Sequence, residues 1–162
     1  MPAFELPPIH RTFRQSAEVI EASAPTASML VLVVERDPHV RELEAHFLKE
    51  AGFAVAFATD GKEALEQAQS QLPQIVITEI LVPKLDGLAL CRQLKADIRT
   101  RDITVLVFSI LAASSRAAEA GADAFLMKPL AEQRLLSTVK SLIQKRQVSK
   151  EQSDANNSST TP

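Results

Sequence analysis

The chain has 162 residues, enough for one domain with additional segments, and 46% hydrophobic with 23% charged residues predict a folded protein. Its formal net charge of -2 gives no reason to expect binding to nucleic acid or to an anionic membrane surface. The single cysteine, Cys91, excludes an internal disulfide, and because the chain shows neither a signal-peptide pattern nor a membrane-length apolar run, we expect a cytoplasmic protein.

The two ends of the chain differ in composition from its middle. Residues 1–27 are rich in proline, alanine and serine, and their one helix-like run, residues 11–22, contains too few apolar residues for a strong amphipathic stripe. We expect a weakly structured N-terminal extension. Residues 147–162 are polar and rich in serine and asparagine, so they cannot bury enough apolar surface to offset the entropy of ordering. We expect a disordered tail there, which leaves residues 28–146 as the folded domain.

Short apolar runs alternate with segments of helical periodicity through the folded domain. The first run, residues 29–34, reads MLVLVV, which is typical of a strand covered on both faces. Four more apolar runs follow it, at residues 53–58, 75–78, 103–108 and 124–127. The alternation predicts an α/β protein with a five-stranded parallel sheet and helices on both faces.

Local signals mark where the intervening helices begin. Asp37 followed by Pro38 offers an N-cap and then proline at the first helical position. Asp60 and Glu63 have the spacing of a capping box before the next helix. A third helix is expected from about Gly87, and the last follows the fifth strand. Capping alone is enough to explain Asp37, so this acid need not belong to a binding site.

Polar residues follow the carboxyl ends of the predicted strands. In open parallel sheets ligands bind outside these ends, at the point where the strand order reverses. Topology therefore brings an acidic cluster, a lone carboxylate, a hydroxyl and an amine to one edge of the sheet. These residues are Glu35, Arg36 and Asp37 after the first strand, Glu79 after the third, Ser109 after the fourth and Lys128 after the fifth.

Five motifs, in this order and with suitable separations, resemble the receiver domain of two-component response regulators. They are LVLVVERDPHVRELEAHFLKEAGF, DGKEALE, PQIVITEILVPKLDGLALCRQLK, FS at the end of the fourth strand, and EAGADAFLMKPL. The resemblance covers roughly residues 28–146. It implies a doubly wound, flavodoxin-like (CheY-like) fold with strand order 2-1-3-4-5.

The resemblance also implies roles for individual residues. In the family, an aspartate at the position of Glu79 accepts a phosphoryl group from the phosphohistidine of a sensor kinase. Mg²⁺ is held by acids after the first strand, by the acceptor and by the backbone carbonyl that corresponds to Leu81. Ser109 and Lys128 match the residues that hold the phosphoryl oxygens. Phe125 falls on the position of the aromatic switch residue.

Two positions depart from the family pattern. Glu79 is longer than aspartate by one methylene, which moves the carboxylate by about 1.5 Å. The reacting atoms of such a site must be positioned more accurately than that. Arg36 replaces an acid beside the metal, and its permanent positive charge cannot coordinate Mg²⁺. The charges of Glu35, Arg36, Glu79 and Lys128 then sum to zero, where an acid at position 36 would give -2. We therefore expect no metal or other cofactor, and we expect Arg36 and Lys128 to form ion pairs with Glu79.

The segment between the fourth and fifth strands is shorter than in the family by about three residues, nearly one helical turn. We expect the helix between Ser109 and Gly121 to be short or irregular. Receivers bind partners or dimerise through this face, so the usual output surface is in doubt.

These departures predict a stand-alone, non-enzymatic receiver that acts as a protein-interaction module in phosphorelay signalling without normal aspartyl phosphorylation. Its partner would be a sensor kinase or an output protein, and a homodimer is a further option. Glu79 would either imitate part of a phosphoryl group or fix an inactive state. The alternative hypothesis is a slow phosphoacceptor that binds Mg²⁺ through Glu35, Asp37 and the Leu81 carbonyl. An unrelated ligand or enzymatic site has the least support.

Overall fold

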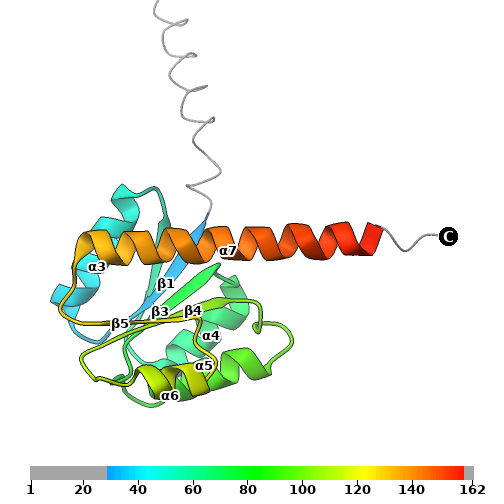
Figure 1. Ribbon diagram of the computed structural model, residues 1–162. Helices are drawn as coiled ribbons and strands as arrows, with labels where there is room; N and C mark the ends of the chain where they lie inside the picture. The colour runs from blue at the N-terminus through cyan, green and yellow to red at the C-terminus, as the bar shows by residue number, and fades with distance from the viewer. Residues whose placement is uncertain (1–28, 159–162) are drawn as a thin grey trace, which may run out of the picture.

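The computed structural model describes residues 29–158, in which strands and helices alternate along the chain (Figure 1). The weakly structured extension expected for residues 1–27 lies outside the described part. The strands are β1 (Leu30–Val34), β2 (Ala54–Ala58), β3 (Ile75–Thr78), β4 (Thr104–Ser109) and β5 (Ala124–Met127). The helices are α3 (Pro38–Glu50), α4 (Gly61–Gln71), α5 (Gly87–Ala96), α6 (Ser114–Glu119) and α7 (Glu132–Ser158). None of the described helices is long and apolar enough to cross a membrane.

The strands form one parallel sheet in the order β2-β1-β3-β4-β5. Helices α3 and α7 cover one face, and α4, α5 and α6 cover the other (Figure 1). In the register, Val34 pairs with both Ala58 and Thr78, so β1, β2 and β3 end together at one edge. The predicted flavodoxin-like fold and strand order are confirmed.

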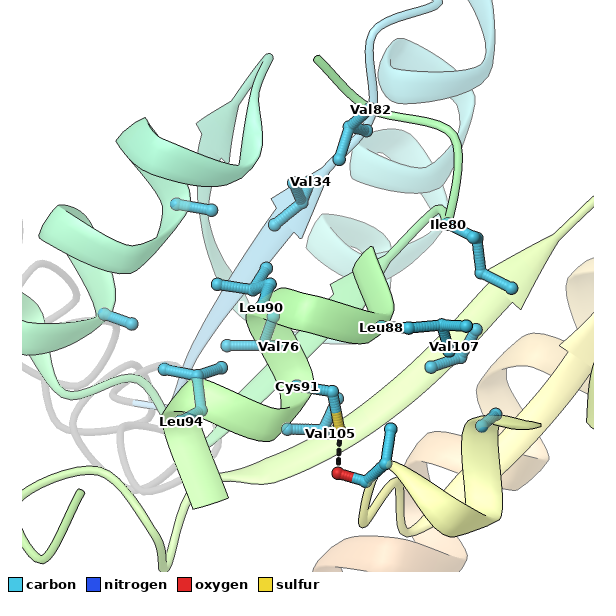
Figure 2. Close-up of a cluster of buried hydrophobic side chains, with 14 of the residues drawn as sticks. Val34, Val76, Ile80, Val82, Leu88, Leu90, Cys91, Leu94, Val105 and Val107 are labelled. Atoms are coloured by element: carbon cyan, nitrogen blue, oxygen red, sulfur yellow. Dashed lines mark hydrogen bonds between the residues drawn. The ribbon is translucent and has the colours of Figure 1, made fainter. Parts of the chain in front are cut away.

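The core consists of two apolar clusters, one on each face of the sheet. Side chains alternate along a strand, so Val31 and Val33 enter the cluster under α3 and α7, whereas Leu32 and Val34 enter the other. This explains the uninterrupted apolar run of β1. Figure 2 shows the second cluster, where Cys91 of α5 is fully buried and its Sγ donates to a backbone carbonyl. Burial raises the pKa of this thiol to about 11, which fits a core residue.

The predicted helix caps are present. The Asp37 carboxylate accepts from the His39 amide (2.9 Å), and Asp60 accepts from the Glu63 amide (2.8 Å). The Thr59 amide in turn donates to the Glu63 carboxylate (3.3 Å), so the two ends of this first turn exchange hydrogen bonds as in a capping box. Helix α6 has only six residues and no side-chain cap, in agreement with the shortened segment.

Helix α7 corrects the prediction for the C-terminal end. The expected disorder from residue 147 is wrong for residues 147–158, because α7 continues to Ser158 and projects beyond the sheet (Figure 1). The first part of α7 packs on the core through Leu135 and Val139, which stabilises the helix there. Each further residue then adds a backbone hydrogen bond without a second nucleation step. Composition predicted correctly that this part buries little surface, since residues 147–157 are exposed.

Removal of residues 148–162 is therefore expected to change the free energy of unfolding by less than about 1 kcal/mol. Residues 148–157 are exposed, so the core should stay intact, while far-UV circular dichroism should lose helical signal. Urea unfolding of the full and shortened chains measures both quantities. A clearly lower midpoint for the shortened chain would contradict this expectation and show that the projecting half of α7 stabilises the domain.

Candidate functional site

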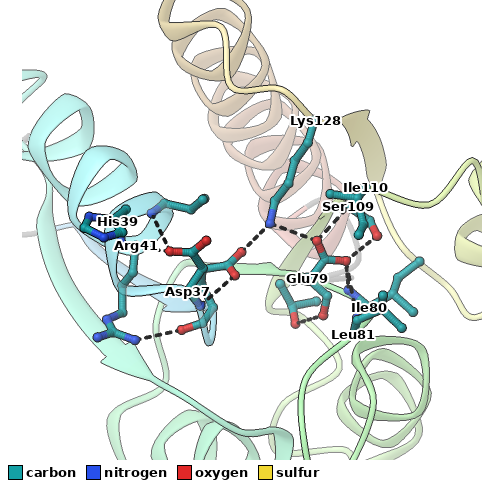
Figure 3. Close-up of polar contacts among 12 residues, drawn as sticks. Asp37, His39, Arg41, Glu79, Ile80, Leu81, Ser109, Ile110 and Lys128 are labelled. Carbon is teal, nitrogen blue, oxygen red and sulfur yellow. Dashed lines mark hydrogen bonds and ion pairs between the residues drawn. The ribbon is translucent and has the colours of Figure 1, made fainter.

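The carboxyl edge of the sheet gathers charged and polar side chains from four strands (Figure 3). Glu35 directly follows β1, Glu79 follows β3, Ser109 ends β4 and Lys128 follows β5. All four predicted residues meet there, although Glu35 and Lys128 are 93 positions apart in the sequence. Parallel pairing places these strand ends side by side.

Glu79 lies at the centre of this site, with only 4% of its surface exposed. Backbone amides, a hydroxyl and an ammonium surround its carboxylate, and all of them are donors. The donors to Oε1 are Ile80 N (2.7 Å), Leu81 N (3.3 Å) and Ser109 Oγ, and those to Oε2 are Ile110 N (3.2 Å) and Lys128 Nζ (2.9 Å). The side chain is therefore held as an anion in one orientation.

The pKa values agree with an ionised pair. Burial alone would raise the pKa of Glu79, but hydrogen bonds from Lys128 and Ser109 outweigh burial and hold the pKa below its ordinary value. Burial would lower the pKa of Lys128, yet its bonds to Glu35 and Glu79 hold that pKa above its ordinary value. At neutral pH both Glu79 and Lys128 are charged.

Lys128 is shared by two buried carboxylates. Its Nζ lies 2.6 Å from Glu35 Oε2 and 2.9 Å from Glu79 Oε2. The other Glu35 oxygen accepts from the Asp37 amide (3.1 Å), and Arg41 Nη1 donates to the backbone carbonyl of Glu35 (3.0 Å). Two acids and one amine leave this buried group of three with a net charge of -1.

Arg36 does not behave as predicted. Its side chain is exposed and makes no ion pair within the described residues, so the expected pair with Glu79 is wrong. Glu35 turns into the pocket as the chain leaves β1, and the next residue faces solvent. The predicted charge balance of zero therefore does not hold inside the pocket.

The residues present do not fit a magnesium ion. Glu35 and Glu79 already accept from Lys128 and backbone amides, and the exposed Asp37 carboxylate caps α3. Among residues 29–158, no group of three or more His, Cys, Asp or Glu side chains is arranged to hold a metal ion. Arg36 adds a positive charge where the family pattern has an acid.

Phe125 lies on β5, where it pairs in register with Val107 and is half-buried against the cluster under α4, α5 and α6. The described contacts of the Glu79 carboxylate do not include it. Its role as a switch residue stays a prediction.

Glu44 was not predicted from the sequence as a buried acid, yet it lies on α3 with 1% of its surface exposed. Among the described residues, Glu44 Oε2 is the one buried side-chain nitrogen or oxygen atom without a hydrogen-bond partner. Burial, reinforced by the negative charge of Glu35, raises the pKa of Glu44 to about 8. A signal was available: Glu44 is four residues before Leu48 and therefore lies on the buried stripe of the helix.

Comparison with known proteins identifies relatives of this chain. Residues 31–140 match the family described as response regulator receiver domain. Response regulator MprA of Mycolicibacterium vanbaalenii is 38% identical over 118 residues, which are 71% of this chain and 50% of the relative. MprA of Mycobacterium ulcerans is 38% identical over 121 residues, 73% of this chain and 51% of the relative. The chain spans about half the length of these relatives.

Solved structures show the same likeness. The signal receiver domain of a histidine kinase from Syntrophus aciditrophicus matches with a TM-score of 0.69 and 35% identity, over 73% of this chain and 92% of the other. A response regulator described as putative from Chloroflexus aurantiacus matches with a TM-score of 0.68 and 32% identity, over 70% of this chain and 96% of the other. Because the family match covers residues 31–140 and the sheet has the strand order of this fold, the chain belongs to the response regulator receiver domain family.

Proposed function

We propose that this receiver works in two-component signalling as a protein-interaction module in which Glu79 takes the place of a phosphoryl group. One observation supports this proposal above others: the Glu79 carboxylate accepts from Ser109 Oγ and Lys128 Nζ at once. In the family, the hydroxyl and the lysine at these positions hold phosphoryl oxygens. The extra methylene of glutamate supports an active-like state, because it lets the carboxylate reach these donors.

The same contacts disfavour phosphorylation of Glu79. An attacking carboxylate oxygen needs a free lone pair aimed at phosphorus, and both oxygens already accept from amides or from Lys128. The lowered pKa of Glu79 also makes the carboxylate a weaker nucleophile. Position 36 adds a positive charge instead of a metal ligand.

If Glu79 holds the receiver in one state, its signalling would depend on which partners bind its surface and on how much of the protein is present. We propose a sensor kinase or an output protein as the partner, and a homodimer as a further assembly. No catalytic role is proposed. Helix α6 has six residues, so the partner would meet a surface shorter than the usual one on this side.

The test uses the full chain with Mg²⁺ and a small phosphodonor such as acetyl phosphate. We expect the intact mass to remain that of the unmodified protein, and we expect the Arg36→Asp, Glu79→Asp double variant to gain one phosphoryl group. Glu79→Asp alone, the matched control, shortens the acceptor but keeps the arginine, so it should gain less.

Backbone amide spectra with and without Mg²⁺ complete the experiment. Large Mg²⁺-dependent shifts at Glu35 or Leu81 of the unaltered chain, or a stable phosphoryl adduct on it, would overturn the proposal. Either result would favour the slow phosphoacceptor, with Mg²⁺ held by Glu35, Asp37 and the Leu81 carbonyl.

A further inference from the structure

A groove lies between α7 and the amino ends of β4 and β5, and we call it the amino-edge groove. It consists of two cavities of about 360 and 370 Å³, which share three lining residues and are therefore continuous. Thr104 begins β4 and Asp123 directly precedes β5, so both lie at the opposite ends of these strands from the site described above. The amino-edge groove is therefore separate from that site.

One wall of the amino-edge groove is a single face of α7, whose end projects beyond the sheet (Figure 1). The lining residues recur three or four positions apart, which places them on one side of a helix. They are Leu142, Lys145, Arg146, Ser149, Lys150 and Ser153. From Leu142 to Ser153 the helix rises by about 16 Å. An extended polypeptide rises about 3.3 Å per residue, so the wall matches about five residues of a bound peptide.

The amino-edge groove is basic, although the protein as a whole has a net charge of -2. Its lining carries five positive and two negative side chains, a net charge of +3. The positive ones are Lys95, Arg101, Lys145, Arg146 and Lys150. Since the whole chain sums to -2, the remaining residues sum to -5. An anionic partner is therefore attracted to this groove in preference to the rest of the surface.

Two of these cations are held in place by contacts at the amino edge of the sheet. Lys95 Nζ lies 2.9 Å from Asp123 Oδ2 and donates to the Ile103 carbonyl at 2.7 Å. Arg146 Nη1 donates to the Gln74 carbonyl at 2.8 Å. Both side chains are half-buried. These contacts fix the two cations and hold α7 beside the strand ends.

The other three cations are not used by the fold in this way. Arg101, Lys145 and Lys150 are exposed, and none of them makes an ion pair within residues 29–158. Their charges are therefore available to carboxylates from outside. Ser149 and Ser153 add hydroxyl groups to the same face of α7, and hydroxyls donate readily to carboxylates and to peptide carbonyls.

We propose that the amino-edge groove binds an acidic, extended segment of a partner protein. Lys145 and Lys150 are separated along the helix by about 7.5 Å, so the positive charges follow the wall instead of converging on one point. A row of carboxylates matches this arrangement better than one compact anion does. The proposal does not rest on the role of Glu79, because the groove lies at the other edge of the sheet.

Two features of the lining disfavour phosphate-bearing ligands. Asp102 lines both cavities, so it would repel a polyphosphate, which is charged along its whole length. A peptide can place a neutral residue opposite this acid. Stacking of a nucleobase needs an aromatic side chain or a similar flat surface, and no aromatic residue is among those that line the groove.

Nuclear magnetic resonance of the full chain with a defined peptide tests the proposal. The probe is an N-acetylated peptide of alternating glutamate and serine, about eight residues long so that it covers the wall. We expect the amide shifts of Arg101, Lys145 and Ser149 to change, and those of Ile80 and Leu81 beside Glu79 to stay constant. The same peptide with glutamine in place of glutamate should not bind. Added salt should weaken the binding of the acidic peptide.

Two double variants separate the groove from the general field of the protein. Lys145→Glu, Lys150→Glu should weaken binding of the acidic peptide by about tenfold or more, because two attractive charges become repulsive. Lys62→Glu, Arg92→Glu is the matched control: it changes the net charge equally at exposed positions of α4 and α5, outside the groove. It should weaken binding by less than about threefold.

Four results would overturn the proposal. The first is that millimolar acidic peptide leaves the groove amides unchanged, and the second is an equal loss of affinity in the two double variants. The third is that tripolyphosphate binds the groove more tightly than the peptide at the same ionic strength, which would indicate a phosphate site. The fourth is that the groove amides shift with protein concentration alone, which would make a second copy of this chain the occupant.

Discussion

Replacement of Lys128 by methionine is expected to lower the free energy of unfolding by about 3–5 kcal/mol, the range seen when one partner of a buried ion pair is removed. Lys128 Nζ is bound to Glu35 Oε2 at 2.6 Å and to Glu79 Oε2 at 2.9 Å, and the side chains of both acids are only 4% exposed. Methionine keeps the apolar stem, so the loss reports on the charge. Both carboxylates would remain buried without a cation. Urea unfolding at pH 7 measures the change.

Lys84→Met is the matched control for this substitution. Lys84 pairs with Asp60 at 3.4 Å, but its side chain is 64% exposed, so its loss should cost less than about 1 kcal/mol. The combined variant Lys128→Met, Glu35→Gln, Glu79→Gln should recover part of the stability, because it removes the unpaired charges. A loss for Lys128→Met no larger than that for Lys84→Met would refute the buried-pair account.

The ion pair of Glu79 with Lys128 determines how the free energy of unfolding changes at acidic pH. The pKa of Glu79 is lower in the folded protein than its ordinary value of 4.5. Its contribution to stability is therefore present above about pH 4.5 and is lost as the pH falls through the lowered pKa. In Lys128→Met this contribution should be smaller, because only the Ser109 hydroxyl and the backbone amides then favour the charged form.

Substitution of Gly87 by alanine is the second change expected to have a large effect. An added Cβ would lie 2.2 Å from the Glu79 carbonyl oxygen and 2.9 Å from Ile80 Cα, both backbone atoms. The Gly87 amide also donates to the Ile80 carbonyl at 2.9 Å, so the first turn of α5 cannot move away freely. We expect the free energy of unfolding to fall by about 3 kcal/mol, the upper end of the range for an overpacked site. The clash would also move the backbone that places Glu79.

Urea unfolding and the amide spectrum together check this expectation. The unfolding midpoint should fall, and the Ile80 and Leu81 amide shifts should change more than those of β2. Gln71→Ala, at the exposed end of α4, adds an alanine without a clash and should be nearly neutral. An unchanged midpoint in Gly87→Ala would show that the loop after β3 yields to the added methyl group.

Much of the fold was predictable because its signals are local. The caps at Asp37 and Asp60 act over two or three residues, and both are present. The continuous apolar run of β1 predicted a strand covered on both faces, and its side chains enter both core clusters. The end of α7 was not predictable in this way, since its helix extends from a packed segment.

The site was predictable only as a set of residues near one edge. Glu35, Glu79, Ser109 and Lys128 meet there because parallel strands end together. Arg36 was assigned to the pocket from the family resemblance and the charge count, and its direction out of β1 places it in solvent. Glu44 was overlooked because the helical stripe was read for apolar residues.

The sequence by itself determined the order of strands and helices, the caps and the supply of charges at the carboxyl edge. These depend on periodicity and on contacts between residues a few positions apart. Only the tertiary structure decided which charges meet. Lys128 pairs with Glu35, which is 93 positions away in the sequence. Glu44 is shielded from solvent because α3 packs on the sheet. Ion pairing and desolvation depend on distance and burial in space, which no local pattern specifies.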